Sequence, residues 1–289
     1  MAEPRPLGRG ELRTLLETHE IRPRKALGQN FVVDPNTVER IARLAGVGVG
    51  DRVVEVGAGL GSLTVALART GAQVTAIEID HRLVAELPSI VPETVRIVEA
   101  DVLRCDWDEI LATPEGPGAE WVLVANLPYN VATSLVVRLL QGVPAIRRMF
   151  VLVQAEVGER LAATPGDRTY GAVTVRVAYF ASARLVGRVS PHVFYPKPKV
   201  DSVLVSIERR RRPAVAADVA SYAEIDALVR AGFAGRRKML RRALAGLVAP
   251  QAFEAAGVDA RLRAEQLDVV AWGKLAACQR SIESSRPPS

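Results

Sequence analysis

The segment VVEVGAGLGSLT, residues 53–64, constrains the fold of this chain more than any other stretch. An apolar, strand-like run leads straight into Gly57, Gly59 and Gly61, and a helix-like run follows. Glycines at such a junction permit a tight turn and let the backbone approach a ligand closely. The segment therefore predicts a strand, a ligand-binding turn and a helix.

Acidic residues follow at the ends of the next expected strands. Glu78 lies nineteen positions after Gly59, where an acidic side chain can accept hydrogen bonds from ribose hydroxyls, and Asp101 ends a third strand-like run. Because open parallel sheets bind ligands beyond the carboxyl ends of their strands, we expect the glycines and both acids to meet in one crevice. Asp80 precedes a helix-like run and is expected to cap that helix.

Strand-like and helix-like runs alternate along most of the chain, beginning with apolar positions at helical spacing over residues 34–45. Expected strands cover residues 52–59, 73–80, 95–101, 121–128, 148–156, 172–189 and 199–209. Expected helices cover residues 63–71, 81–90 and 131–141, and one more ends near residue 163. This alternation predicts an α/β fold with a mostly parallel, doubly wound sheet, and the paired strands near its end predict an antiparallel edge.

The composition divides the chain into three regions. Residues 1–21 begin with MAEPRPLGRG and are expected to form a flexible N-terminal extension. Residues 22–212 hold the alternating elements and end in the charged joint ERRRR. Residues 213–289 show short helix-like runs broken by Gly and Pro, which predict a small C-terminal helical domain.

Charge and cysteine content narrow the class of function. A net charge of +6 and a pI of about 9.7 favour a polyanionic partner such as nucleic acid. Cys105 and Cys278 lack CxxC spacing and the three histidines are scattered, so we expect neither a disulfide framework nor a bound metal. Without an apolar signal region or a run of about 18 apolar residues, we expect a cytoplasmic protein and no membrane partner.

The glycine turn leaves two cofactor classes open, a dinucleotide and S-adenosylmethionine. The pattern is GxGxG preceded by Glu55, and Ser62 stands where a dinucleotide fingerprint has its third glycine. This difference favours S-adenosylmethionine, although the spacing is compatible with both cofactors.

The stretch WVLVANLPYNVATSLVV, residues 121–137, ends another expected strand in an unusual way. Asn126 and Pro128 suit a turn, because asparagine favours turns and proline removes a backbone donor. A turn alone does not explain Tyr129 or the helix-like run that follows it. The NLPY element is therefore a candidate for chemistry at the same edge of the sheet.

Taken in order, EVGAGLG, IEID, EAD and NLPY resemble the motifs of class I S-adenosylmethionine-dependent methyltransferases that act on amino nitrogens. More specifically, the chain resembles the small-subunit (16S) ribosomal RNA adenine N6,N6-dimethyltransferase family, the KsgA type, from about residue 22 to about residue 277. The longer stretches that carry this likeness are RPRKALGQNFVVDPN, FVLVQAEVGERL, VFYPKPKVDSVLV, and FAGRRKMLRRAL followed by RAEQL. It implies a Rossmann-like methyltransferase domain over residues 22–212 and an RNA-binding helical domain over residues 213–289.

The resemblance implies a binding site for S-adenosyl-L-methionine. It places the methionine end and the ribose region of the cofactor against Asn30 and the backbone at Val32, where the family usually has Leu. The other implied contacts are Gly57 to the methionine moiety, Glu78 to the ribose, Asp101 to the adenine and Asn126 beside the sulfonium, and Gly59 is a further cofactor-binding residue.

The resemblance also implies a catalytic set of Asn126, Leu127, Pro128, Tyr129 and Phe194. If the Asn126 side-chain oxygen and the carbonyl of Leu127 or Pro128 accept both hydrogens of an exocyclic amine, its lone pair can point at the methyl carbon. Positioning and electrostatics then carry the rate without a general base. Tyr129 offers a stacking face to the target base, and Phe194 either closes the other face or docks its loop on the core.

The basic stretches are the expected RNA contacts. On a helix, GRRKMLRR would put Arg237 and Arg241 on one face and apolar residues on another, although such a run can also be a solvated surface. The missing acidic balance favours phosphate contact. The candidate RNA-binding residues are Arg24, Lys25, Lys197, Lys199, Arg236, Arg237, Lys238 and Arg241.

The implied substrate is a pair of adjacent adenines in the 3′-terminal hairpin loop of small-subunit rRNA, each receiving two methyl groups. We expect a monomer that acts on this rRNA within a pre-assembled small subunit and serves its biogenesis. Three alternatives stay open: a large-subunit rRNA adenine methyltransferase of the macrolide-resistance type, a non-catalytic RNA-binding assembly factor, and a dehydrogenase, which would leave NLPY unexplained.

Overall fold

The computed structural model describes residues 4–114, 116, 118–128 and 131–285. Its contacts divide the chain into two compact units. The first unit comprises residues 1–158 and 184–208, and the second comprises residues 159–183 and 209–289. The domain boundary expected between residues 212 and 213 stays a prediction, and each unit is described by itself.

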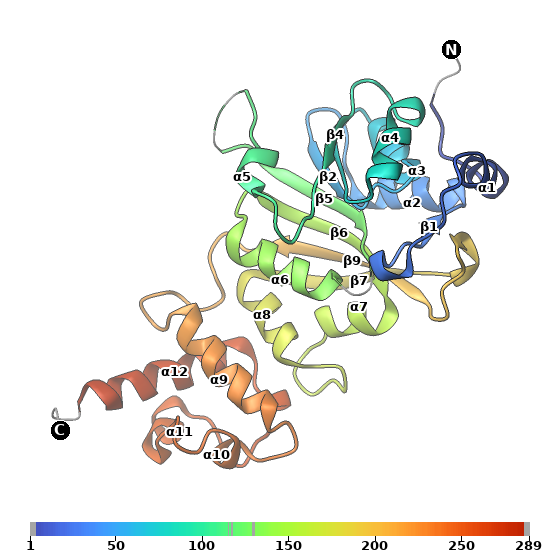
Figure 1. Cartoon of the computed structure of the whole chain (residues 1–289). Coiled ribbons are helices and arrows are strands. Elements are labelled where there is room, and N and C mark those ends of the chain that lie inside the picture. Colours follow the sequence, from blue (N-terminus) through green and yellow to red (C-terminus); the bar gives the residue numbers. More distant parts are fainter. Residues whose placement is uncertain (1–3, 115, 117, 129–130, 286–289) are drawn as a thin grey trace. The chain divides into compact units, whose positions relative to one another are not determined.

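The first unit is built on a seven-stranded sheet (Figure 1). Its spatial order is β4 (Arg96–Glu99), β3 (Gln73–Glu78), β2 (Arg52–Val56), β5 (Trp121–Asn126), β6 (Ile146–Gln154), β9 (Ser202–Arg209) and β7 (Ala181–Val189). The first five strands are parallel, and β9 pairs antiparallel with β6. The predicted α/β fold class, a mostly parallel doubly wound sheet with an antiparallel edge, is confirmed.

The strand order reverses between β2 and β5. From β2 the chain proceeds outward through β3 to β4, whereas β5 and β6 lie on the other side of β2. Open α/β sheets bind ligands at such a reversal, outside the carboxyl ends of the strands. The glycine turn follows β2 and the NLPY element follows β5, so both junctions flank this position.

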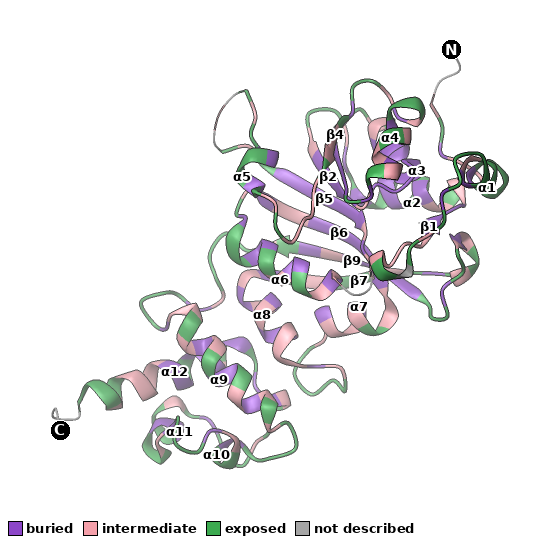
Figure 2. Ribbon diagram, viewed as in Figure 1, coloured by how far each residue is buried: buried purple, intermediate pink, exposed green. Residues whose placement is uncertain are grey.

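The strands hold the core of the first unit, and helices cover the sheet. These helices are α2 (Pro35–Ala45), α3 (Ser62–Ala68), α4 (His81–Ile90), α5 (Trp107–Ile110), α6 (Ala132–Gly142) and α7 (Ala155–Leu161), the last of which continues into the second unit. Helices α3 and α4 pack against β3, and α6 packs against β6. Figure 2 shows the central strands as mostly buried, in line with the full burial of Val53, Leu123 and Val124.

The predicted helix over residues 34–45 is confirmed by α2. The Asp34 side chain accepts a hydrogen bond from the Thr37 N–H, Pro35 occupies the first turn, and Gly46 ends the helix in a left-handed conformation. Its buried face carries Val38 and Ile41, at the apolar spacing seen in the sequence.

The N-terminal region differs from the flexible extension that its Pro and Gly content suggested. Residues Arg9–Thr18 form helix α1, on which Leu12 and Leu16 are buried. They pack in an apolar cluster that includes Phe31, Leu60 and Leu83. This short helix is held by tertiary packing, which a composition-based argument does not register.

A two-stranded antiparallel sheet completes the first unit. It joins β1 (Phe31–Val32) to β8 (Phe194–Tyr195), with Val32 opposite Phe194. Short 3₁₀ turns precede both strands, over Lys25–Leu27 and Pro191–Val193. The N-terminal segment is thereby fixed near the sheet edge that holds the glycine turn.

The second unit is helical and has its own core. Its helices are α8 (Ala172–Phe180), α9 (Tyr222–Ala234), α10 (Leu240–Ala243), α11 (Pro250–Ala256) and α12 (Val269–Ser284), with a 3₁₀ turn over Ala264–Gln266. Fully buried Trp272 lies at Gly232, where a Cβ atom would come within 2.6 Å of the indole. The Tyr170 hydroxyl donates to the Leu267 carbonyl at 2.8 Å.

The strand expected over residues 172–189 is wrong in its first half, because residues 172–180 form α8. β-branched residues favour strands on local grounds, but Val175 and Val177 are buried on a helix that packs against α9 and α12. The cationic helix expected from GRRKMLRR is also wrong. Helix α10 begins only at Leu240, and residues 235–238 form a turn.

Within the described parts of the chain, no helix has the length and apolar character that a membrane span requires.

Candidate active site

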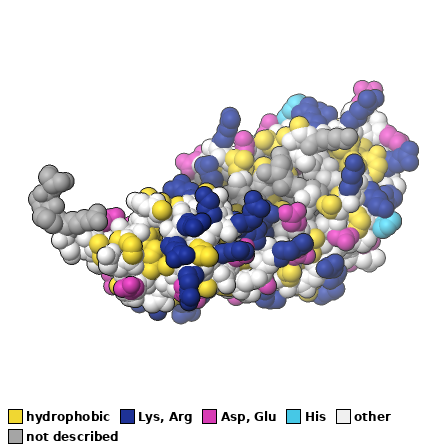
Figure 3. Space-filling view, turned by 90° about the horizontal axis from the view of Figure 1, so that it is seen from below, with side chains coloured by type: hydrophobic (Ala, Val, Ile, Leu, Met, Phe, Trp, Pro, Cys, Tyr) yellow, Lys and Arg dark blue, Asp and Glu magenta, His cyan; other side chains and the backbone are white. Residues whose placement is uncertain are grey.

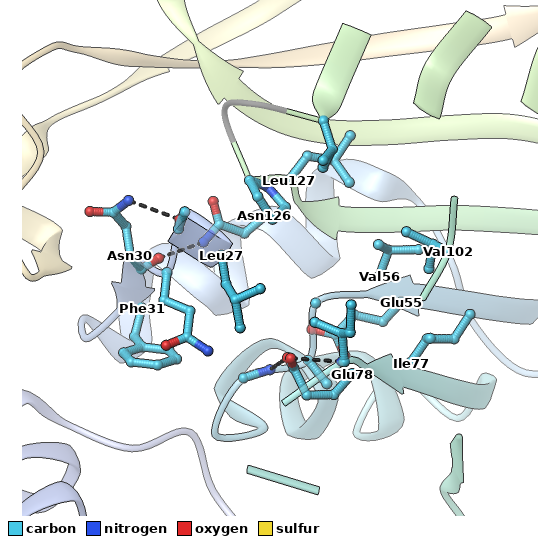
Figure 4. Close-up of a pocket in the computed structure, with 18 of the residues that line it drawn as sticks. Leu27, Asn30, Phe31, Glu55, Val56, Ile77, Glu78, Val102, Asn126 and Leu127 are labelled. Atoms are coloured by element: carbon cyan, nitrogen blue, oxygen red, sulfur yellow. Dashed lines mark hydrogen bonds between the residues drawn. The ribbon is translucent and has the colours of Figure 1, made fainter. Parts of the chain in front are cut away.

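A cavity of about 150 Å³ lies at the carboxyl ends of β2, β3 and β5, within the first unit (Figure 4). Its walls come from the glycine turn, the ends of β3 and β4, the NLPY element and the N-terminal segment. The lining residues named in the following paragraphs include Gln29, Asn30, Phe31, Val32, Glu55, Gly57, Gly59, Ser62, Ile77, Glu78, Ile79, Asp101, Asn126, Leu127 and Pro128. The predicted convergence with Glu78 and Asp101 is confirmed for Gly57 and Gly59, whereas Gly61 does not line the cavity.

Gly59 meets two requirements that only glycine satisfies without strain. Its φ is +59°, and a Cβ atom would lie 2.9 Å from Cδ1 of Phe31. Gly57 is also left-handed, with φ +74°. The Gly57 N–H donates to the Ile77 carbonyl, so a ligand contact at Gly57 would use its carbonyl oxygen.

Glu78 ends β3 with its carboxylate almost fully buried. Oε2 accepts from the Gly59 N–H at 2.8 Å, and Oε1 accepts from the N–H groups of Ile79 at 2.9 Å and Asp80 at 3.0 Å. Burial raises the pKa of Glu78, although these donors oppose the shift. A carboxylate offers about four acceptor positions, so one remains on Oε2 for a ligand hydroxyl.

Asp80 caps α4, as predicted, by accepting a hydrogen bond from the Arg82 N–H. The Arg82 guanidinium also donates to both carboxylate oxygens, which lowers the pKa of Asp80. Two further groups reach this buried carboxylate: Gln29 Nε2 donates to Oδ2 at 3.1 Å, and Arg24 Nη1 lies 3.9 Å from Oδ1. Asp80 therefore ties the N-terminal segment to α4.

Asp101 follows β4 and is partly exposed at the cavity. Its Oδ1 accepts from the Leu103 N–H at 2.9 Å, and its Oδ2 lies 3.7 Å from Arg104 Nε. The backbone contact fixes one oxygen of the carboxylate, and the expected contact with the cofactor adenine stays a prediction.

Asn126 is the last residue of β5, and its amide is oriented by the N-terminal segment (Figure 4). Its Nδ2 donates to the Asn30 carbonyl at 2.8 Å, while the Asn30 amide donates to the Gly28 carbonyl at 3.1 Å. With Nδ2 engaged in this way, Asn126 Oδ1 is the amide atom left to accept hydrogen bonds at the cavity.

The sequence left the carbonyls of Leu127 and Pro128 as equal candidates for the second acceptor of the amine, and the structure distinguishes them. The Pro128 carbonyl accepts from the N–H groups of Val131 and Ala132, each at 3.1 Å, and so begins α6. No residue that the structure describes donates to the Leu127 carbonyl, whereas the Leu127 N–H is held by the Leu152 carbonyl at 3.0 Å. Leu127 is therefore the better second acceptor.

Of the two aromatic residues expected to stack on the target base, the structure describes only Phe194. Phe194 is fully buried in the main core cluster opposite Val32, and it does not line the cavity. The structure thus shows the core-packing alternative for Phe194. Tyr129 and the Lys25 side chain lie outside the described residues.

Sequence reasoning gave no role to Glu55, which lines the cavity and is only 1% exposed. Its Oε2 has no hydrogen-bond partner among the described residues, and neither does the buried hydroxyl of Ser62 nearby in the chain. Burial raises the pKa of Glu55 to about 8, with a further contribution from the charge of Glu78. The signal in the sequence was an acidic residue inside an otherwise apolar strand.

The acidic side chains at the cavity are Glu55, Glu78 and Asp101, and no Lys or Arg lines it among the described residues. Such a set of hydrogen-bond acceptors suits a ligand with hydroxyl and cationic groups, which S-adenosylmethionine has in its ribose, ammonium and sulfonium. The residues present therefore fit this cofactor. A nicotinamide dinucleotide, with two phosphates, fits an acidic cavity less well.

Replacing Glu55 by glutamine is expected to remove a loss of stability that the wild type suffers as the pH rises. Because its folded-state pKa is raised, Glu55 keeps a proton that the unfolded chain has lost, and folding stability falls between pH 4.5 and about pH 8. The full shift corresponds to about 5 kcal/mol. Urea denaturation at pH 5 and pH 8.5 should show the variant gaining stability over the wild type at the higher pH. An equal difference at both values would contradict this account.

The residues expected to contact RNA lie in both units. In the first unit, the Arg24, Lys197 and Lys199 side chains are exposed. In the second, Arg236 is committed to Glu265 at 2.8 Å and to the Arg168 carbonyl. The exposed Arg237 and Lys238 have no ion pair to a described residue, and exposed Arg241 lies on α10. Figure 3 shows numerous Lys and Arg side chains on the face that it views.

A glycine turn between a strand and a helix is compatible with the binding of many nucleotides. Its combination with an Asn-Leu-Pro element, where the strand order reverses, indicates a smaller range of protein classes. Fold and site together define a class I S-adenosylmethionine-dependent methyltransferase that modifies an amino nitrogen. Comparison with known proteins carries the assignment further. The model of the family described as ribosomal RNA adenine dimethylase matches residues 21–278, and the chain belongs to this family.

Relatives and solved structures agree with this assignment. "Ribosomal RNA small subunit methyltransferase A" of Kineococcus radiotolerans is 48% identical, over 92% of this chain and 89% of the relative. The protein of the same name from Leifsonia xyli subsp. xyli is 46% identical, over 96% and 100%. A dimethyladenosine transferase from Plasmodium falciparum superposes with a TM-score of 0.70 at 24% identity, covering 84% and 94%. The 23S rRNA methyltransferase ErmE gives a TM-score of 0.66 at 25% identity, covering 86% and 99%.

Proposed function

We propose that this chain transfers methyl groups from S-adenosylmethionine to N6 of two adjacent adenines in small-subunit rRNA. The adenines lie in the 3′-terminal hairpin loop, and each becomes N6,N6-dimethyladenosine in the course of small-subunit biogenesis. The observation that carries the proposal is near-full-length similarity, at 46–48% identity, to proteins named for methylation of the small-subunit rRNA. The large-subunit methyltransferase among the solved structures stands at 25% identity.

Asn126 and Leu127 activate the target amine by accepting its two hydrogens. When bound, the cofactor supplies an electrophilic methyl group on a sulfonium. Asn126 Oδ1 and the Leu127 carbonyl hold the N6 hydrogens, so that the nitrogen lone pair points out of the ring plane toward the methyl carbon. The Pro128 carbonyl stays with α6 and keeps the turn rigid. Transfer breaks the methyl–sulfur bond and leaves a neutral thioether, and the methylated nitrogen then loses one N6 proton to water. One hydrogen remains on the neutral amine, and one acceptor contact suffices for the second transfer.

The cofactor contacts follow from the free positions of the cavity residues. Glu78 has one acceptor position left for a ribose hydroxyl, and Asp101 lies where it can accept from the adenine amine. Gly57 contributes its carbonyl to the methionine ammonium, and Asn30 and Val32 bound the methionine end from the N-terminal segment. Gly59 keeps the turn close to the ligand.

A base in a duplex cannot enter this cavity, so the target adenine has to be unpaired or flipped. We retain Tyr129 as the stacking face for that base. Phe194 can serve as the second face only if its ring leaves the core, since it is fully buried. The hairpin loop of the proposed substrate supplies unpaired adenines without that cost.

Arg237 and Lys238 are the proposed phosphate contacts of the second unit. Changing both to glutamine should weaken binding to small-subunit rRNA and reduce the slope of log affinity against log salt by about 2. Filter binding at several salt concentrations measures this slope. The matched control is Arg13→Gln, because Arg13 is already paired with Glu17 at 2.7 Å. A slope unchanged in the double variant, or lowered equally in the control, would contradict these contacts.

We place the reaction in the cytoplasm, on a pre-assembled small subunit, with the protein acting as a monomer. The direct test uses small and large ribosomal subunits purified from cells that lack this methylation. Radiolabelled S-adenosylmethionine should deliver label to the small-subunit rRNA, with about four methyl groups per subunit. Label on the large subunit alone would refute the proposal, and no cofactor binding in calorimetry would revive the non-catalytic alternative.

A further inference from the structure

The segment of residues 24–32, here called the N-terminal strap, is held by hydrogen bonds at two adjacent residues, Gln29 and Asn30, which both line the cavity. Gln29 Nε2 donates to Asp80 Oδ2 at 3.1 Å, and Gln29 Oε1 accepts from the Arg24 N–H at 2.7 Å. The Asn30 carbonyl accepts from Asn126 Nδ2 at 2.8 Å. Adjacent residues of the strap thus connect Asp80, at the start of α4, with Asn126, at the end of β5.

Asp80 has more partners than a helix cap needs. Capping requires one oxygen that accepts from an N–H of the first turn, and Oδ1 does this for Arg82. The second oxygen is shared by Arg82 Nη2 at 2.7 Å and by Gln29 Nε2, in a carboxylate that is 1% exposed. A buried charge with a fully assigned set of donors holds those donors firmly, so the Gln29 contact is a fixed point for the strap.

The orientation of the Asn126 amide depends on Asn30, the next residue of the strap. Rotation of this amide by 180° would exchange Oδ1 and Nδ2, and would present a donor where the proposed reaction needs an acceptor. The Asn30 carbonyl selects one orientation, because an oxygen there attracts the NH₂ group and repels the amide oxygen. Figure 4 shows this hydrogen bond between the labelled residues Asn30 and Asn126.

Packing on the C-terminal side of Asn30 leaves little room for adjustment. Phe31 lies against Gly59, where an added Cβ atom would come within 2.9 Å of the ring. The ring is buried in the apolar cluster that also contains Leu60 and Leu83. The Asn30 carbonyl therefore lies between two held residues, Gln29 on one side and Phe31 on the other, and freeing Gln29 leaves it held from one side only.

We propose that Gln29 and Asp80 are positioning residues for methyl transfer, which fasten the strap so that the Asn30 carbonyl holds the Asn126 amide with Oδ1 toward the target amine. The inference rests on the proposed function only in giving Asn126 that target. Neither Gln29 nor Asp80 contacts the amine itself.

Two substitutions at Gln29 separate positioning from folding. Gln29→Met removes both side-chain hydrogen bonds and keeps the length of the side chain. It should lower kcat about fivefold to tenfold, as expected for one lost buried hydrogen bond, with the Kd for S-adenosylmethionine changed less than about threefold. Gln29→Lys restores a donor to Asp80 and should recover most of the kcat. The matched control is Gln251→Met, because Gln251 is an exposed residue of α11.

Nuclear magnetic resonance gives a readout that needs neither cofactor nor RNA. The chain has asparagine only at positions 30, 36, 126 and 130, so selective ¹⁵N-asparagine labelling yields four side-chain amides. The Asn126 pair, assigned by its loss in Asn126→Asp, should be protected from solvent exchange in the wild type and in Gln29→Lys. It should lose protection at least tenfold in Gln29→Met.

The two readouts distinguish failure of this inference from failure of the proposed function. Unchanged Asn126 protection and unchanged kcat in Gln29→Met would overturn the positioning role. Equal loss of kcat in the Met and Lys variants would also overturn it. An inactive wild type on small subunits would refute the proposed function, while the amide protection would still decide whether Gln29 orients Asn126.

Discussion

The Asn126→Ala variant is expected to lose about a hundredfold to a thousandfold in kcat, the range found when one preorganised polar group is removed from an active site. The Asn126 side chain donates through Nδ2 to the Asn30 carbonyl, which leaves Oδ1 to accept a hydrogen bond from the target amine. The Leu127 carbonyl is the second acceptor. Without Asn126 Oδ1 the target amine keeps its planar, delocalised form. The Kd for S-adenosylmethionine should rise less than about tenfold, since the contact removed is mainly to the substrate.

Single-turnover methylation of small subunits, with calorimetric titration of the cofactor, separates these two effects for Asn126→Ala. Asn36→Ala is the matched control, because Asn36 is exposed on α2. If cofactor binding collapses while turnover at saturating cofactor stays normal, Asn126 serves the cofactor and the assigned role is wrong.

Glu78→Ala should weaken cofactor binding much more than it lowers kcat, the reverse of Asn126→Ala. Its carboxylate has one acceptor position left for the ribose, and a hydrogen bond to a charged group contributes about 1.5–3 kcal/mol. The Kd for S-adenosylmethionine should therefore rise about tenfold to a hundredfold, with kcat at saturating cofactor within a few-fold of the wild type. The truncation also strands the N–H groups of Gly59, Ile79 and Asp80, so a lower melting temperature is expected.

Glu99→Ala is the matched control for this variant, since Glu99 is the register partner of Glu78 on β4 and is exposed. Calorimetric titration and thermal unfolding of both variants measure the effects. A normal cofactor affinity in Glu78→Ala would remove Glu78 from the ribose site.

The sheet and the edge that binds the cofactor could be predicted because they depend on local rules with one spatial outcome. Gly57 follows β2 and Glu78 ends β3, and the carboxyl ends of these neighbouring parallel strands must meet at one edge. Asp80 as a helix cap is equally local, since its partner is the N–H of Arg82 two residues away. Such features need no knowledge of distant packing.

What the sequence did not indicate depends on contacts between distant parts of the chain. Helix α8 replaces a strand because its Val residues are buried against α9 and α12. Phe194 is packed in the core because its register partner is Val32, which comes 162 positions earlier in the sequence. The orientation of Asn126 is decided by the backbone of Asn30, which no pattern of side chains could reveal.

Glu55 shows the same limit for a titrating group. Inside the strand motif it reads as one acidic residue among valines, and its raised pKa follows only from burial and from the nearby Glu78. Spacing along a sequence locates ligand edges, whereas the protonation of a residue at that edge is set by three-dimensional packing.

The measurement that most directly tests the central claim is mass mapping of methylated adenines in rRNA from cells with and without this gene. The account predicts two adjacent N6,N6-dimethyladenosines in the 3′-terminal hairpin of small-subunit rRNA when the gene is present, and two unmodified adenines when it is deleted. Unchanged methylation of that hairpin after deletion, with a loss at a large-subunit adenine instead, would contradict the account.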